Sequence, residues 1–309
     1  MPPPNVFTIA PDRPFLDTLA RGLMAFAGDD PLLLPRMTVL LPTQRAARSL
    51  REAFLRLTSG VDTAPLLLPR LRPIGGLDND ELGVGGLAEA TLAIPPAIPE
   101  LRRRLLLTRL VLGWSAAKDG AALLPGQAAA LAAALARLLD MAASEEASFD
   151  RLHELAPAEY AEHWQLVLDF LEMLPRLWPS ILEAEGAIDP ADRRNRLLRR
   201  QARLWREAPP RAPVIAAGLM GGMPALSDLL STVAWLDQGA VILPGLDRAA
   251  NSEQWELIAE EPSHPQHQIA LLLRELDLTP DEVADWPPMP DRGAGSRPER
   301  GADGDGRGA

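Results

Sequence analysis

Short apolar runs alternate with helical patterns toward both ends of this chain. Each run is rich in β-branched or aliphatic residues and is bounded by proline, glycine or polar residues, which is typical of buried strands. Most of them are followed by apolar residues that recur every three or four positions, as in an amphipathic helix. Repeated strand and helix units predict an α/β fold with a parallel sheet. The expected strands cover residues 5–10, 38–41, 66–68 and 214–217 and a run that begins at Gly239.

From about residue 99 the pattern is helical for nearly a hundred positions. Helices joined by short connections are expected here, with Pro125, Pro157, Pro175 and Pro179 between them, because proline removes a helical hydrogen bond and clashes with the preceding turn. We interpret this segment as a helical insertion in the α/β domain. The expected helices cover residues 100–114, 127–143, 160–177 and 189–207. The residues expected to form the buried face of the first of these helices are Leu101, Leu105, Thr108 and Leu112.

These patterns divide the chain into four parts. Residues 1–95 form the first part of the α/β domain, residues 96–210 the helical insertion, and residues 211–286 the second part of the α/β domain. Residues 287–309 have the glycine, proline and charge content of a disordered tail. A globular sequence that ends in this way is interpreted as truncated or as read into a different frame.

Composition narrows the classes of function. The formal net charge of -11 argues against a uniformly basic nucleic-acid coat protein, although a local basic groove remains compatible with it. Without cysteine, these residues offer no thiol nucleophile and no cysteine-ligated zinc or iron–sulfur site. Lys118 is the single lysine, so arginine carries nearly all the positive charge and any one arginine cluster has less weight.

Targeting segments are not recognisable in this sequence. The first residues, MPPPNVFTIAPDRP, lack the basic start and the long apolar core of a secretion signal. Apolar runs stay well below the roughly 20 residues that a membrane helix needs. A cytoplasmic protein without a membrane partner is expected.

The turn after residues 38–41 carries candidate binding residues. Thr43 stands at the expected N-cap of a helix, followed by Gln44 and Arg45, with Arg48 on the polar face. Ligand sites of parallel α/β sheets lie at the carboxyl ends of the strands, where this turn is expected. Hydroxyl, amide, guanidinium and free backbone N–H groups all bind phosphate oxygens, so the turn is a candidate nucleic-acid contact. The alternative is an ordinary strand and helix unit with a solvated, arginine-rich surface.

A second candidate is the most basic segment, residues 189–207. Asp189 is expected to cap this helix, with Pro190 in its first turn. Positions three and four residues apart share a helix face. Arginines at this spacing form a basic stripe along the helix. This stripe could follow a phosphate backbone, or it could be the solvated face of a helix in an arginine-rich protein. Its members are Arg196, Arg199, Arg200 and Arg203, with Leu197, Leu198, Ala202 and Trp205 turned the other way.

The loop after the first strand is where a nucleotide-binding protein would hold phosphates. That function needs the pattern G-x-x-x-x-G-K-[ST]. With Thr18 in the last position, Pro11, Leu16 and Asp17 occupy the places of glycine, glycine and lysine. Because an aspartate repels a triphosphate, we expect this degenerate loop not to bind ATP in the usual way.

Two further motifs carry weaker chemistry. The glycines of the loop at Gly218, Gly221 and Gly222 do not have the spacing of a dinucleotide-binding fingerprint. His264 and His267 lie three apart at the start of an expected helix, as two metal ligands can. The histidine pair lacks a nearby glutamate base and a third ligand, so a structural or interface role is expected and no metal is assigned.

Several stretches in a fixed order resemble the N-terminal region of AddB-type double-strand break repair proteins, in their alphaproteobacterial form. The resemblance runs from about Asn5 to Trp286. It implies a degenerate RecA-like sheet of a superfamily-one helicase with a large helical insertion. The stretches that carry it include VFTIAPDRPFLDTLA, VLLPTQRAARSLREAF, LLLPRLRPIG, IPELRRRLLLTRLVL, HWQLVLDFL, DPADRRNRLL, PVIAAGLMGGMPALSDLL, VILPGLD and SHPQHQIALLLREL.

Members of that family are subunits of a heterodimeric helicase-nuclease that processes broken DNA ends for recombination. The stretch LPTQRAAR is similar to the helicase motif that touches single-stranded DNA, which implies strand contacts by Thr43, Gln44 and Arg45. The phosphate loop departs from an active motor, as in many members of the family. ATP, magnesium and an iron–sulfur cluster would belong to absent regions or to the partner, an AddA-type subunit.

The resemblance thus implies a fragment that holds DNA, as a single strand or a duplex end, and its partner subunit, with no catalytic residue of its own. Two alternatives stay open. One is an α/β enzyme that uses a nucleotide or a metal at the glycine-rich loop or the histidine pair. The other is an assembly module without DNA contact.

Overall fold

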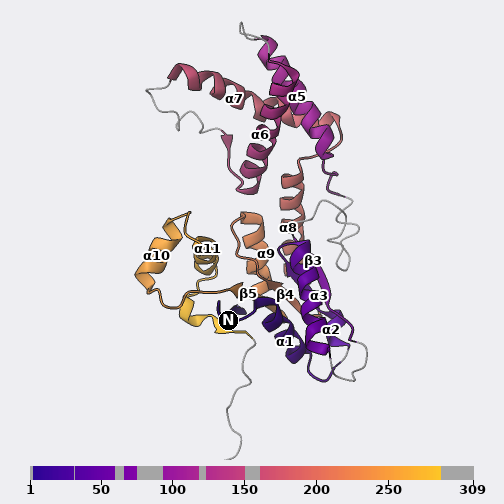
Figure 1. Ribbon diagram of the computed structural model, residues 1–309, viewed down its shortest axis with the longest axis vertical. Coiled ribbons are helices and arrows are strands. Elements are labelled where there is room, and N and C mark those ends of the chain that lie inside the picture. The colour runs from indigo at the N-terminus through magenta and orange to yellow at the C-terminus, as the bar shows by residue number, and fades with distance from the viewer. Residues whose placement is uncertain are drawn as a thin grey trace, which may run out of the picture.

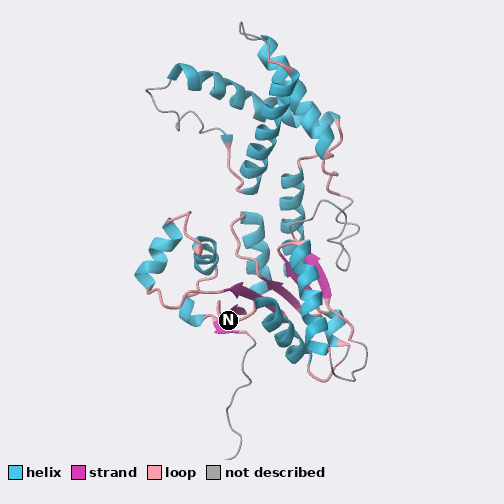
Figure 2. Cartoon of the chain, viewed as in Figure 1, coloured by secondary structure: helices cyan, strands magenta, loops and turns pink. Residues whose placement is uncertain are grey.

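The computed structural model describes residues 3–30, 32–59, 66–74, 93–117, 123–149 and 161–286. Six strands form one sheet in the order β3-β2-β4-β5-β1-β6, and every neighbouring pair is parallel (Figures 1 and 2). The α/β prediction is therefore confirmed. The strands are β1 (Val6–Ile9), β2 (Thr38–Leu41), β3 (Arg70–Pro73), β4 (Val214–Ala217), β5 (Gly239–Pro244) and β6 (Ala284–Asp285).

Helices account for most of the remaining described residues. Four of them, α5 to α8, follow one another between β3 and β4, where the sequence predicts a helical insertion. The helices are α1 (Phe15–Ala27), α2 (Leu33–Arg36), α3 (Gln44–Thr58), α5 (Glu100–Ala117), α6 (Pro125–Ser144), α7 (Ala161–Ala184), α8 (Pro190–Glu207), α9 (Pro224–Ala234), α10 (Ser252–Glu260), α11 (His267–Glu275) and the 3-10 helix η3 (Pro280–Glu282). The predicted tail, residues 287–309, lies outside the described residues.

The strand expected at residues 66–68 is wrong, because the third strand is β3, four residues further on. Arg70 is the first residue that pairs with β2, opposite Thr38, and its N–H donates to the Met37 carbonyl at 2.9 Å. Residues 66–68 precede that start and have no part of β2 beside them, so their apolar character does not make them a strand.

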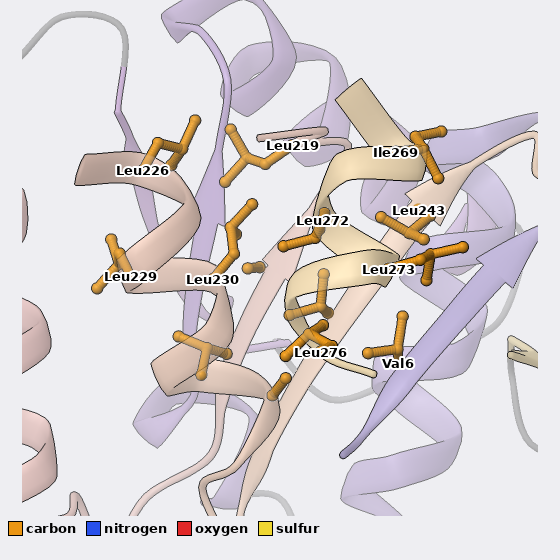
Figure 3. Packing of buried hydrophobic residues seen from close by; sticks show 14 of the residues in the cluster. Val6, Leu219, Leu226, Leu229, Leu230, Leu243, Ile269, Leu272, Leu273 and Leu276 are labelled. Carbon is orange, nitrogen blue, oxygen red and sulfur yellow. The ribbon is translucent and has the colours of Figure 1, made fainter. Parts of the chain in front are cut away.

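Both faces of the sheet are buried, as a parallel sheet requires. Successive residues of a strand point to opposite faces. In β4, Val214 and Ala216 belong to one hydrophobic cluster, and Ile215 and Ala217 to the other. The first cluster includes residues of α8, α9, α10 and α11, part of which Figure 3 shows, and the second includes residues of α1 and α3. The sheet is therefore the middle of three layers.

Trp286 completes the α1 side of the sheet. Its backbone N–H donates to the Thr8 carbonyl at 2.8 Å, and its ring lies edge-on to Phe7 at 5.4 Å between ring centroids. On its other side the indole reaches the backbone of α1 at Gly22, where a β-carbon would lie 2.1 Å from Nε1 of Trp286. A residue without a side chain is needed for this contact.

The insertion has a hydrophobic core of its own, separate from the two clusters on the sheet. Leu107 of α5, Ala132 of α6 and Trp178 of α7 belong to it. The α7 helix continues through Pro175 and Pro179, so the expectation that these prolines separate helices is wrong. Proline removes one hydrogen bond at each position, and the bonds and packing of the rest of this 24-residue helix maintain it.

The buried face predicted for α5 is also wrong. Leu101 and Leu105 are 71% and 56% exposed, and the buried positions are Arg103, Leu107, Val111 and Ser115. The prediction excluded an arginine from the core, as a sequence pattern normally should. Arg103 is nevertheless buried, because acidic side chains from two other helical segments form ion pairs with it.

Arg103 forms the polar centre of the insertion. Its side chain is 5% exposed and forms ion pairs with Asp140 at 2.9 Å and Asp189 at 2.7 Å. Trp178 donates from Nε1 to the same Asp189 carboxylate at 2.7 Å. Burial raises the pKa of Asp189 from its ordinary value, against the opposing effect of Arg103. Asp189 stands at the N-cap of α8 but makes no capping hydrogen bond, because its carboxylate serves this cluster instead.

Helix α8 joins the insertion to the sheet (Figure 1). Near its start, Asn195 donates to the Ala143 carbonyl at the end of α6 at 2.7 Å. Further along, Leu198 and Trp205 belong to the cluster that covers the sheet. One helix therefore contributes to the packing of both parts of the molecule.

The contact between Gly22 and Trp286 predicts that Gly22→Ala destabilises the protein by about 1–3 kcal/mol, the usual cost of overpacking a core. Urea denaturation measures the change. Gly126→Ala is the control, since a β-carbon at Gly126, also helical, meets nothing within 4 Å. Equal effects of the two substitutions would contradict the packing described for Trp286.

Arg103→Met should destabilise the insertion by about 3–5 kcal/mol, because it leaves a buried carboxylate without its cation. Burial raises the pKa of Asp189 in the folded protein. Below the pKa of the unfolded state the carboxyl group is uncharged, so losing Arg103 costs little stability there. The cost grows as the pH rises through the folded-state pKa and the carboxylate becomes charged. The loss should thus be smaller near pH 4 than near pH 7, as measured by urea denaturation. Arg102→Met, next in sequence, removes an exposed pair with Glu185 and should have much less effect.

Candidate functional site

The turns that follow β1, β2, β4 and β5 meet at one edge of the sheet. In an open parallel sheet, ligands bind at this carboxyl edge where neighbouring strands lead to helices on opposite faces. Here β2 leads to α3 on one face, and its neighbour β4 leads to α9 on the other. The turn that contains Thr43 therefore lies at such a crossing point, together with the glycine-rich loop at Gly218.

Thr43 is the N-cap of α3, as predicted. Its backbone is extended, with φ of -143° and ψ of 161°, and its Oγ1 accepts a hydrogen bond from the Ala46 N–H at 3.1 Å. The Thr43 carbonyl accepts from the Ala47 N–H at 3.1 Å. The hydroxyl hydrogen is not used by the cap, so Thr43 can still donate to an oxygen of a ligand.

Gln44, Arg45 and Arg48 extend from this turn into solvent. All three are exposed, whereas Ala47 and Leu50 on the opposite side of α3 are buried. Within the described ranges, neither Arg45 nor Arg48 has an ion-pair partner. Two uncompensated cations, an amide and a hydroxyl donor thus lie on one exposed surface, which we call the α3 turn and which comprises Thr43, Gln44, Arg45 and Arg48.

The loop after β1 has no open phosphate cradle. Pro11 has no N–H to offer, and Thr18 is buried with its N–H bonded to the Pro14 carbonyl at 2.9 Å. Leu16, in the place of the second glycine, is half-buried. A β-carbon on Gly218 would lie 3.4 Å from the Phe15 ring and 3.8 Å from Cδ of Pro42, so apolar groups occupy the space between these turns.

Asp17 forms an ion pair with α3. Its carboxylate pairs with Arg56 in the last turn of α3 at 2.5 Å. This ion pair ties α1 to α3 on the same face of the sheet. Phe15 lies beside Gly218 at this edge of the sheet, and the sequence pattern did not single it out.

The glycine-rich loop is explained by packing. Gly222 has a φ of 97°, a conformation that side chains disfavour, and a β-carbon there would lie 2.7 Å from Oε1 of Gln268 on α11. Gly221 has a φ of 90° and closes on the same helix. The glycines let this loop turn tightly against α11.

The two histidines bind backbone groups. His267 is buried, with Nδ1 3.0 Å from the Ile258 carbonyl, and Nδ1 of His264 accepts from the Gln266 N–H at 3.2 Å. Among the described residues there is no group of three or more histidine, cysteine, aspartate or glutamate side chains arranged to hold a metal ion. His267 joins the end of α10 to the start of α11.

The arginine stripe on α8 is exposed as predicted, but half of its charge is compensated. Arg196 pairs with Asp192 at 2.9 Å, and Arg199 pairs with Glu146 at 2.5 Å. The hydrogen bond with Glu146 raises the pKa of Arg199. Arg200 and Arg203 are exposed and have no ion pair with any residue that the structure describes. Asp192 could be found from its spacing of four residues, whereas Glu146 comes from another helix end.

These features define the class of protein: an α/β protein whose all-parallel sheet carries a helical insertion between its third and fourth strands. Models of protein families gave no match to this sequence, and neither did proteins of curated function. Across the described ranges, the helices are too short or too polar to cross a lipid bilayer.

Replacing the N-cap threonine tests the geometry of the α3 turn. Thr43→Ala removes the acceptor for the Ala46 N–H and should cost about 1 kcal/mol in the free energy of unfolding. Thr43→Ser keeps the hydroxyl oxygen and should retain most of that stability. Urea denaturation of both variants provides the measurement, and an unchanged Thr43→Ala protein would contradict the cap.

Proposed function

We propose that this chain is a non-motor, helicase-like part of a heterodimeric helicase-nuclease subunit that processes DNA double-strand breaks, and that its α3 turn holds single-stranded DNA. The observation that carries the proposal is the pair of uncompensated arginines, Arg45 and Arg48, beside the free hydroxyl hydrogen of Thr43 at the carboxyl edge of the sheet. Phosphate contacts supply most of the affinity for a polynucleotide without reading its sequence.

The loop after β1 supports the non-motor part of the proposal. A triphosphate cradle needs backbone N–H groups and a cation. Here Pro11 has no N–H, Asp17 is paired with Arg56, and Phe15 occupies the space beside Gly218. An ATP-driven step would then come from the partner subunit. The expected RecA-like character of the sheet belongs to the same proposal and is supported by its parallel strands and by the position of the α3 turn.

The stripe on α8 has a smaller part in this proposal than the sequence suggested. Arg196 and Arg199 neutralise carboxylates, and Arg199 holds the end of α6 to α8. Arg200 and Arg203 keep their charge for a second stretch of the phosphate backbone.

Anisotropy of a fluorescent oligothymidylate of about 20 nucleotides tests strand binding by the 309-residue chain. The double variant Arg45→Gln/Arg48→Gln should bind about tenfold more weakly. The slope of log affinity against log salt should fall in magnitude by about 1.4, since each phosphate contact on a single strand contributes about 0.7.

The matched control is Arg36→Gln/Arg211→Gln. It removes the same charge from exposed arginines that precede β2 and β4, at the opposite edge of the sheet. Equal weakening by both double variants would show a non-specific charge effect and exclude the α3 turn. Hydrolysis of ATP by the chain alone would contradict the non-motor assignment.

A further inference from the structure

Helix α5 has more apolar surface than the described structure covers. Its buried side, which includes Leu107 and Val111, packs in the core of the insertion. Leu101 and Leu105 are mostly exposed, although a soluble helix with one covered face normally has a polar opposite face.

An open groove lies along a different part of α5, from Leu106 to Ala117. It has a volume of about 590 Å³ and runs between α5 and α7. On α5 the lining residues recur at three and four residue steps, so they form a continuous stripe. The residues that line the groove are Leu106, Arg109, Leu110, Gly113, Trp114 and Ala117 of α5 and Met173, Leu177 and Ile181 of α7.

Gly113 gives the groove its depth. A β-carbon on Gly113 would meet nothing within 4 Å, so the backbone of α5 is open to the groove there. The neighbouring Trp114 lies 5.0 Å from Phe170 of α7 between ring centroids. Two helices therefore form the walls, and a gap in one of them admits a side chain from outside.

The charge beside the groove selects the occupant. Arg109 is the charged residue among the described residues of the lining, and it is exposed with no ion pair to them. Arg176, between Met173 and Leu177 in α7, is likewise exposed and uncompensated. By contrast, Arg102 and Arg104 on the same helix pair with Glu185 and Glu100. Arg109 and Arg176 thus place two exposed cations, without an ion pair among the described residues, next to an apolar surface.

We infer that this groove binds an amphipathic helix of another protein, with an apolar stripe and acidic residues beside it. Helices bind apolar grooves through side chains at positions i, i+3, i+4 and i+7. The groove is lined along α5 from Leu106 to Ala117, a length of about 18 Å, so it suits a partner helix of about three turns. A second copy of this chain fits poorly, since a two-fold contact would bring the Arg109 side chains of both copies together. The inference is independent of DNA binding by the α3 turn.

Two labelled synthetic peptides of about 18 residues test the inference by fluorescence anisotropy with the 309-residue chain. Both carry leucines at positions i, i+3, i+4 and i+7, flanked by glutamate in one peptide and by lysine in the other. The glutamate peptide should bind at least about tenfold more tightly, with a Kd on the order of 10 µM. Equal binding of both peptides, or no binding, would overturn the inference.

Three variants locate the binding. Gly113→Trp fills the groove and should abolish binding of the glutamate peptide, whereas Gly113→Ala leaves most of the space and should bind as the parent chain does. Arg109→Glu changes only an exposed charge and should reverse the preference toward the lysine peptide, which keeps the test decisive if Gly113→Trp fails to fold. Unchanged preference in Arg109→Glu would overturn the inference. Sedimentation showing a dimer of the parent chain that Gly113→Trp dissociates would assign the groove to a second copy and overturn it as well.

Discussion

Burial of both faces of a parallel sheet is the constraint on which the rest of this structure depends. Parallel strands all begin at the same edge, so after each strand the chain must cross back over a face of the sheet. Each crossing contains one or more helices or the whole insertion. The turns after β1, β2, β4 and β5 are thereby gathered at one edge. Gly218 is far in sequence from Phe15 and Pro42, and it lies beside both because of this topology.

A second constraint is the buried cation of the insertion. Arg103 is buried in an apolar core because Asp140 and Asp189 compensate its charge. Asp189 in turn accepts a hydrogen bond from Trp178. The cluster fixes the start of α8, since Asp189 is the residue before that helix. Helix α8 then covers the sheet with Leu198 and Trp205, and Asn195 near its start bonds to the Ala143 carbonyl of α6, so the position of the insertion follows from a helix that contacts both parts.

Ion pairing decides which arginines are open to a ligand. The chain is acidic overall, and some exposed arginines form ion pairs with its carboxylates. Arg199 of α8 pairs with Glu146, and Arg56 of α3 pairs with Asp17 of α1. Arg45, Arg48 and Arg109 form no such pair within the described ranges. A count of basic residues along the sequence gives α8 four arginines in its stripe, whereas the pairing observed in three dimensions leaves Arg200 and Arg203 without a carboxylate among the described residues.

By itself the sequence determined the α/β class, the cap at Thr43 and the outward direction of the α8 stripe, because these depend on local periodicity and on residue type. The absence of the pattern G-x-x-x-x-G-K-[ST] after the first strand is likewise a property of the sequence alone. Only the tertiary structure decided the start of β3, the buried face of α5 and the continuation of α7 through Pro175 and Pro179. Each of these rests on partners distant in sequence: β2 for Arg70, two acidic side chains for Arg103, and the core of the insertion for α7. A local pattern records a residue's own preference, and packing between distant segments outweighs it where a buried charge or a strand partner is supplied from elsewhere.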